Sequence, residues 1–81
     1  MKNAYLIMIL ENDDIYPYKV CLDEMQAKKS VINYVTENNN PDWVQEQMEN
    51  TGTDTIEKIC EFYDYDPDYL GCGYYPIPLL E

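Results

Sequence analysis

The chain of 81 residues has no histidine and only three cysteines, Cys21, Cys60 and Cys72. Without histidine, a cysteine nucleophile has no imidazole base, and a common zinc ligand is missing. The cysteines are odd in number, widely spaced and form no CxxC pair, which argues against a disulfide framework. The sequence therefore predicts reduced thiols in a cytoplasmic protein, with no cofactor.

Long apolar runs and basic residues are also scarce. The run AYLIMIL at residues 4–10 is far shorter than the ~20 residues that span a bilayer, and its flanks do not fit a signal peptide. Five basic residues oppose sixteen carboxylates, which gives a formal net charge of −11. Nucleic acid and anionic membranes would both repel such a chain, so we expect neither as a direct ligand.

The apolar residues that are present indicate strands near both ends of the chain. Residues 4–10 have the length of a buried strand, and the acidic segment after them indicates a longish loop to a second strand at 18–22. In this second strand the apolar set Tyr18, Val20 and Leu22 alternates with the other residues, which is the period of a strand with one covered face.

Prolines limit where these strands can lie in a sheet. Pro17 should lie at the edge or the start of its strand, because proline has no N–H to donate. Two prolines at alternate positions allow residues 74–80 to form only an edge strand or a polyproline-like segment. We expect this segment to pair beside the first strand or to pack across the sheet.

Three helices are predicted, at about 24–36, 41–50 and 55–64. Their start signals are a capping box from Asp23, the pair Asn40-Pro41, and an acidic capping box at 54–57. The regular apolar spacing of the third helix includes Cys60, which is therefore expected to be buried. The sequence thus predicts one α+β domain over residues 1–81, with a small antiparallel sheet, helices over one face, and a loop at 68–73.

The acidic residues are concentrated in one stretch. Residues 37–68 hold ten carboxylates and one lysine, or −9 of the net −11. Solubility is the ordinary explanation of a charged helix face. Like charges one turn apart nevertheless cost about 0.2–0.5 kcal/mol per pair, and a localised field suits a partner of opposite sign. The candidate partner-binding residues are Asp42, Glu46, Glu49, Glu57, Glu61, Asp64, Asp66, Asp68, Tyr65 and Tyr69.

The segment from Asp64 to Asp68 has an alternative interpretation as a divalent-cation loop. Its carboxylates occupy the first, third and fifth positions of a calcium-type loop. The pattern then fails, with Tyr69 at the glycine position and Tyr75 at the position of the last glutamate. Acid–base catalysis by paired carboxylates is disfavoured, because these acids are expected to share one solvated environment.

In length, charge, absence of catalytic residues and carboxylate rows at 42/46/49 and 57/61/64, the chain resembles small acidic proteins of phages and mobile elements. These include anti-CRISPR and anti-restriction proteins that block a host nuclease by imitating DNA. The resemblance includes no diagnostic motif. It implies a non-enzymatic inhibitor that occupies the basic nucleic-acid-binding groove of a partner protein. The alternative is a structural or homo-oligomerising module that acts through the hairpin edge and residues 74–80, with acids that only solubilise it.

Overall fold

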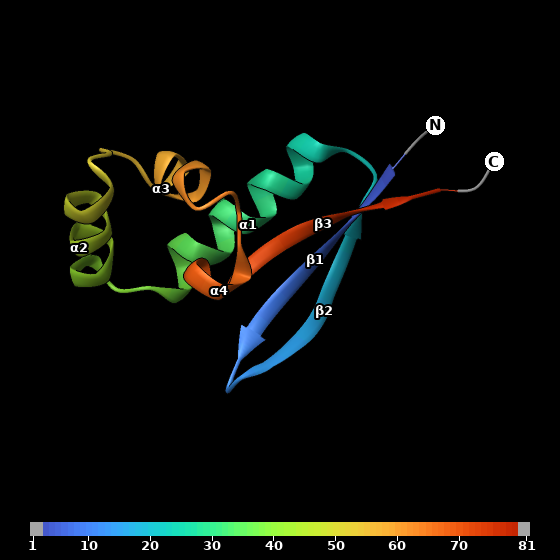
Figure 1. Cartoon of the computed structure of the whole chain (residues 1–81), viewed down its shortest axis with the longest axis horizontal. Helices are drawn as coiled ribbons and strands as arrows, with labels where there is room; N and C mark the ends of the chain where they lie inside the picture. Colours follow the sequence, from blue (N-terminus) through green and yellow to red (C-terminus); the bar gives the residue numbers. More distant parts are fainter. Residues whose placement is uncertain (1–2, 80–81) are drawn as a thin grey trace.

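The computed structural model describes residues 3–79 (Figure 1). Its elements are, in order, β1 (Asn3–Glu11), β2 (Asp14–Cys21), α1 (Glu24–Asn38), α2 (Pro41–Thr51), α3 (Ile56–Phe62), α4 (Pro67–Leu70) and β3 (Cys72–Pro78). The strands form an antiparallel sheet in the order β2-β1-β3, which confirms the predicted α+β class. Strand β3 pairs beside β1 as expected, whereas Leu80 of the predicted strand lies outside the described residues.

The molecule is long and narrow, with extents of 45 × 26 × 16 Å. The sheet lies at one end, α2 lies at the other, and α1 runs between them (Figure 1). Among residues 3–79, no helix has both the length and the apolar character needed to cross a membrane.

The hairpin between β1 and β2 is tighter than the sequence predicted. Its turn consists of Asn12 and Asp13, whose φ values of 52° and 67° are in the left-handed region that these residue types tolerate. The second strand therefore begins at Asp14 rather than at residue 18. Pro17 lies on an edge strand, as expected, beside a register irregularity opposite Ile7 and Met8.

The covered face of β2 is the opposite of the predicted one. Cys21 pairs with Tyr5 and is buried, whereas Val20 and Leu22 are exposed. The pairing places Cys21 on the same face of the sheet as Ile7, which the helices cover. The prediction was wrong because two-residue periodicity separates the faces of a strand without showing which one is buried.

The first two helices begin at their predicted caps. The Asp23 carboxylate accepts the amide of Met25 at 2.8 Å, and the Asn40 side chain accepts the amide of Trp43 at 2.8 Å. Gly52 ends α2 in the left-handed conformation, with φ of 68°, and its amide donates to the Met48 carbonyl.

The third helix is shorter than predicted at both ends. Thr55, not Asp54, is its N-cap and accepts the amide of Lys58 at 3.1 Å. The helix ends at Phe62, because Asp64 and Tyr65 both adopt φ of 53°. The predicted end at residue 64 is therefore wrong.

The loop predicted at 68–73 contains a short helix, α4, which the sequence analysis missed. Asp66 caps it by accepting the amide of Asp68 at 2.9 Å, and Pro67 occupies its first turn. The pair Asp66-Pro67 is the same start signal as Asn40-Pro41 and could have revealed this helix. Gly71 closes the turn with φ of 75°.

The core lies between the inner face of the sheet and helices α1 and α3. Its largest fully buried side chains are Ile7, Val31, Val35, Ile59, Cys60 and Cys72, so the expected burial of Cys60 is confirmed. Strand β3 passes very close to the start of α4. A Cβ atom at Gly73 would collide with the Tyr65 carbonyl oxygen and the Pro67 ring, so only glycine fits there.

Candidate functional site

Helix α2 carries the first predicted acidic row on its solvent side. Asp42, Glu46 and Glu49 are exposed, while Trp43 and Met48 are half-buried against the core. About one turn of helix separates neighbouring acids, or about 4.5–6 Å along the axis. Residues 30–57 contain no lysine, so α2 has no cation of its own to balance this row.

Helix α3 carries only part of the second predicted row. Glu57 and Glu61 are exposed and lie one turn apart. Asp64 is exposed but lies beyond the helix in the left-handed turn, so the predicted row of three on one helix flank is wrong. Its amide donates to the Glu61 carbonyl at 3.0 Å, which turns the chain away from the helix axis.

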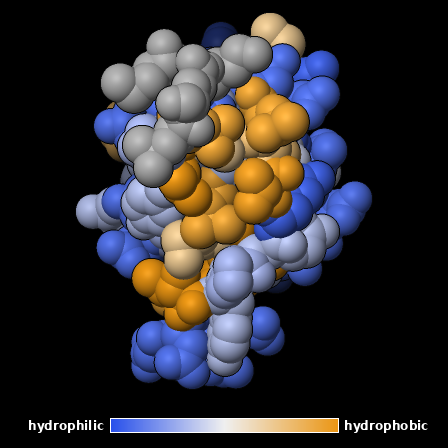
Figure 2. Space-filling model, turned by 90° about the vertical axis from the view of Figure 1, so that its right-hand side faces the viewer, coloured by the Kyte–Doolittle hydropathy of each residue, from blue (hydrophilic) through white to orange (hydrophobic). Residues whose placement is uncertain are grey.

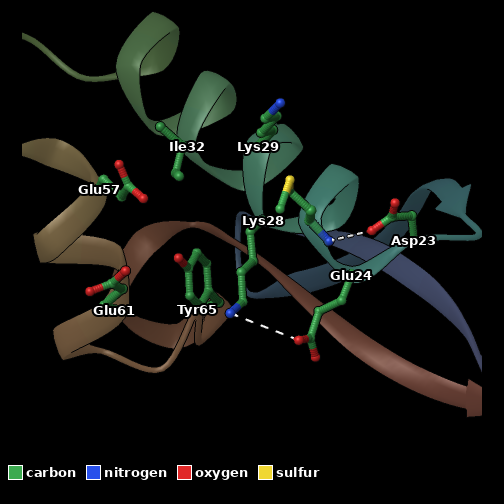
Figure 3. Close-up of a pocket in the computed structure, with 9 residues that line it drawn as sticks. Asp23, Glu24, Lys28, Lys29, Ile32, Glu57, Glu61 and Tyr65 are labelled. Carbon is green, nitrogen blue, oxygen red and sulfur yellow. Dashed lines mark hydrogen bonds and ion pairs between the residues drawn. The ribbon is translucent and has the colours of Figure 1, made fainter.

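Glu57 and Glu61 line one wall of a cleft between α1 and α3 (Figure 3). The cleft has a volume of about 550 Å³ and is lined by Asp23, Glu24, Met25, Lys28, Lys29, Ile32, Glu57, Glu61 and Tyr65. None of the three α2 acids belongs to this lining. The two acidic rows therefore have different surroundings, and only the α2 row stands apart from lysine.

The charges in the cleft are partly balanced within it. The Nζ atom of Lys28 lies 3.8 Å from a Glu24 carboxylate oxygen and 5.6 Å from the centre of the Tyr65 ring. Burial raises the pKa of Tyr65 to about 12, and the charge of Glu61 adds to the shift. The Tyr65 hydroxyl is therefore protonated at neutral pH and is a neutral hydrogen-bonding group in the cleft wall.

The two tyrosines predicted to bind a partner differ in accessibility. Tyr65 is only 6% exposed and packs in the core, so its side chain is not free to contact a partner. The left-handed turn after α3 directs it inward, and its amide donates to the Cys60 carbonyl at 2.9 Å. Tyr69 is 62% exposed and stacks on Tyr63, with ring centres 4.9 Å apart. Tyr69 alone can contact a partner.

The last two predicted acids belong to α4. Asp68 is exposed in its first turn, whereas Asp66 is half-buried and its carboxylate caps the helix. This capping role accounts for the middle acid of the three whose spacing resembled a cation loop. Among residues 3–79, no three side chains of the metal-binding types His, Cys, Asp and Glu come together as a metal site.

The cysteines are buried thiols. Cys21, Cys60 and Cys72 are all unpaired and inaccessible. Burial raises the pKa of Cys60 to about 12 and that of Cys72 to about 11. Neither thiol is ionised at neutral pH, so neither has the reactivity of a thiolate nucleophile.

The largest feature that the sequence analysis missed is the outer face of the sheet. The apolar run at 4–10 predicted a buried strand, but the helices cover only the face that includes Tyr5, Ile7 and Ile9. Leu6, Met8 and Leu10 alternate with these residues and are only partly buried. Figure 2 shows a continuous apolar surface on this end of the molecule. Apolar residues at alternating positions on both faces of β1 were the signal. Helices were predicted over one face of the sheet, but the apolar side chains of the other face were not considered.

No protein-family model, curated protein or solved structure matches the chain. Its function is therefore inferred from the geometry of its own surfaces.

Proposed function

We propose that the protein is a non-enzymatic, cytoplasmic binding protein that occupies a basic nucleic-acid-binding groove of a partner protein and thereby inhibits it. The observation that carries the proposal is the α2 row. Asp42, Glu46 and Glu49 are exposed on the side of α2 away from the core, on a segment without lysine. An ordinary solvated helix gains stability from paired opposite charges, which this row lacks.

The regular spacing of the row is what suits a groove that binds nucleic acid. Carboxylates about 4.5–6 Å apart along a helix present a line of negative charges, as a nucleic-acid strand does. Lysine and arginine that bind phosphates also bind carboxylates through charge-assisted hydrogen bonds. The caps at Asn40 and Gly52 fix where this helix begins and ends.

Other groups near this end can extend the contact. Tyr69 offers an exposed aromatic ring, and a hydrogen bond of 2.7 Å from the Tyr63 hydroxyl to Gln47 links its stacking partner to α2. Exposed tyrosines are frequent in the energetically important parts of interfaces. The negative field also includes the exposed acids Glu57, Glu61, Asp64 and Asp68. Asp66 and Tyr65 have structural roles instead and are not part of the proposed contact.

The proposal is tested by capture from a lysate of the native host at low salt, followed by competition with duplex DNA. Captured partners should be nucleic-acid-binding proteins, and both duplex DNA and moderate salt should release them. The variant Glu46→Gln/Glu49→Gln should lose most of this binding while retaining its helical circular dichroism.

A matched control separates the α2 row from net charge. Glu11→Gln/Asp13→Asn removes the same two charges from the hairpin end, and asparagine suits the left-handed conformation at position 13. This control should bind as the wild type does. Equal losses in the two variants, or captured partners that DNA does not displace, would contradict a nucleic-acid-like contact.

A second candidate function is a homo-oligomerising module, and the uncovered sheet face favours it. The two functions are compatible, because the sheet and α2 lie at opposite ends of the molecule (Figure 1).

A further inference from the structure

The sheet has an outer face that residues 3–79 leave largely uncovered, although Ala4 is buried there and Tyr65 and Pro67 lie against Gly73. The register places Leu6 of β1 between Val20 of β2 and Tyr75 of β3, so these side chains share that face. Ile15 lies beside Leu10, and Ile77 beside Ala4, on the same side. Figure 2 shows the resulting apolar surface at the sheet end of the molecule.

The outer face is comparable in size to the largest apolar patch of a typical soluble domain, which is often functional. Ile15 is 47% exposed, Val20 59%, Tyr75 44% and Ile77 40%. Together with the partly exposed side chains of β1 they present on the order of 500 Å² of apolar surface, and contiguous patches above a few hundred Å² mark interaction sites.

We propose that the outer sheet face binds the same face of a second copy of this chain. The absence of charge on this face supports the contact. The paired positions of this face carry no charged side chain, although the chain carries −11 overall. A partner selected by charge would bind elsewhere, at the acidic helices. An uncharged apolar face is complementary to another copy of itself, as a two-fold symmetric contact requires.

The position of the α2 row also supports the contact. The longest dimension of the molecule is 45 Å, and α2 lies at the end away from the sheet (Figure 1). Two copies packed sheet to sheet therefore point their α2 rows away from each other. Their separation exceeds the Debye length of about 8 Å at physiological salt, so repulsion between these rows is screened.

The strand edges favour face-to-face packing over edge pairing. Strands β2 and β3 are the two edges of the sheet, and they contain Pro17 and Pro76 with Pro78, respectively. Proline has no N–H for a neighbouring strand, so these edges are poor templates for extending the sheet. Packing of two sheets about 10 Å apart uses side chains only and needs no free edge.

The size of the face also predicts the strength of association. Two copies would bury on the order of 1,000 Å² in total, which is at the low end for specific complexes. We therefore expect a reversible dimer with a dissociation constant on the order of micromolar. Salt should not weaken it, since the contact is apolar and the remaining electrostatic term is repulsive.

Sedimentation velocity from about 1 to 500 µM, a range that brackets this dissociation constant, tests the proposal at 0.15 M and 0.5 M NaCl. The wild type should shift from monomer to dimer with rising concentration, at least as strongly at the higher salt. Val20→Lys/Ile77→Lys should remain monomeric throughout, because both exposed side chains would put like charges into the contact.

The matched control is Met25→Lys/Phe62→Lys. It adds the same two charges at exposed apolar residues of α1 and α3, the helices on the opposite side of the sheet, and should dimerise as the wild type does. A monomeric wild type at every concentration would overturn the proposal, as would a dimer that survives the sheet variant. Growth beyond the dimer would also overturn it, because a closed two-fold contact ends at two copies.

A measurement on the wild type covers the case in which the sheet variant does not fold. In an equal mixture of isotope-labelled and unlabelled chains, isotope-filtered NMR should show intermolecular contacts from the methyl groups of Leu6, Val20 and Ile77. Intermolecular contacts only from helix residues would refute the sheet-to-sheet dimer.

Discussion

Replacing Gly73 with alanine is expected to lower the free energy of unfolding by about 2–3 kcal/mol, because overpacking costs of this size follow when atoms cannot move aside. A Cβ atom at this position would lie 2.8 Å from the Pro67 nitrogen and would collide with the Tyr65 carbonyl oxygen and the Pro67 Cδ. These are backbone and ring atoms, so no side-chain rotation relieves the contact. Strand β3 or helix α4 must shift instead.

Urea unfolding followed by circular dichroism measures this loss, which corresponds to a Tm lower by about 8–24 °C for a domain of this length. Gly52→Ala is the matched control. Gly52 has φ of 68° but open space around its Cβ position, so alanine there costs only the left-handed strain, about 1 kcal/mol. If Gly73→Ala were no less stable than Gly52→Ala, the close approach of β3 to α4 would be wrong.

Two further outcomes concern stability. Thr55→Ala should lower the free energy of unfolding by about 1 kcal/mol, because α3 loses its N-cap. Asp54→Asn should lower it less, because Asp54 makes only an exposed pair with Lys58 at 3.0 Å. Urea unfolding of both variants measures the two losses, and the reverse order would contradict these roles. Burial raises the pKa of Cys60 to about 12 and that of Cys72 to about 11, from an ordinary value of 9.0. Above pH 9 the unfolded chain therefore binds fewer protons than the folded one. The free energy of unfolding should consequently fall between pH 9 and 12, whereas these thiols should not change it below pH 9. Urea titrations at pH 7, 9 and 10.5 measure it, and an unchanged value at pH 10.5 would contradict the burial of these thiols.

The helices were the most predictable part of the fold, because their signals are local. Asp23 and Asn40 each accept an amide within the next three residues, so the sequence alone contains both partners. The end of α3 was less predictable. Its helical spacing continues through Tyr63, but the left-handed turn at Asp64 depends on Tyr65 entering a core built from distant segments.

The faces of the sheet could not be assigned from sequence because they depend on which side the helices pack. The apolar residues Val20 and Leu22 match a covered face as well as the buried Cys21 does. Pairing of Cys21 with Tyr5 decides between them, and that contact spans the whole hairpin. The sequence was sufficient to place the acidic row on α2. Only the tertiary structure shows that this row lies apart from Glu57 and Glu61 in the cleft.

Helix α2 differs from the other helices in how it is held. Within Pro41–Thr51 no residue is fully buried, and the helix packs chiefly against α3 through half-buried side chains such as Trp43 and Met48. Local opening of a segment costs less than global unfolding when few buried contacts hold it. We therefore expect the α2 segment to open locally more readily than the sheet, α1 and α3. A ligand that binds only the docked form of α2 would stabilise that form. Part of the ligand's binding free energy would then be used to dock the helix.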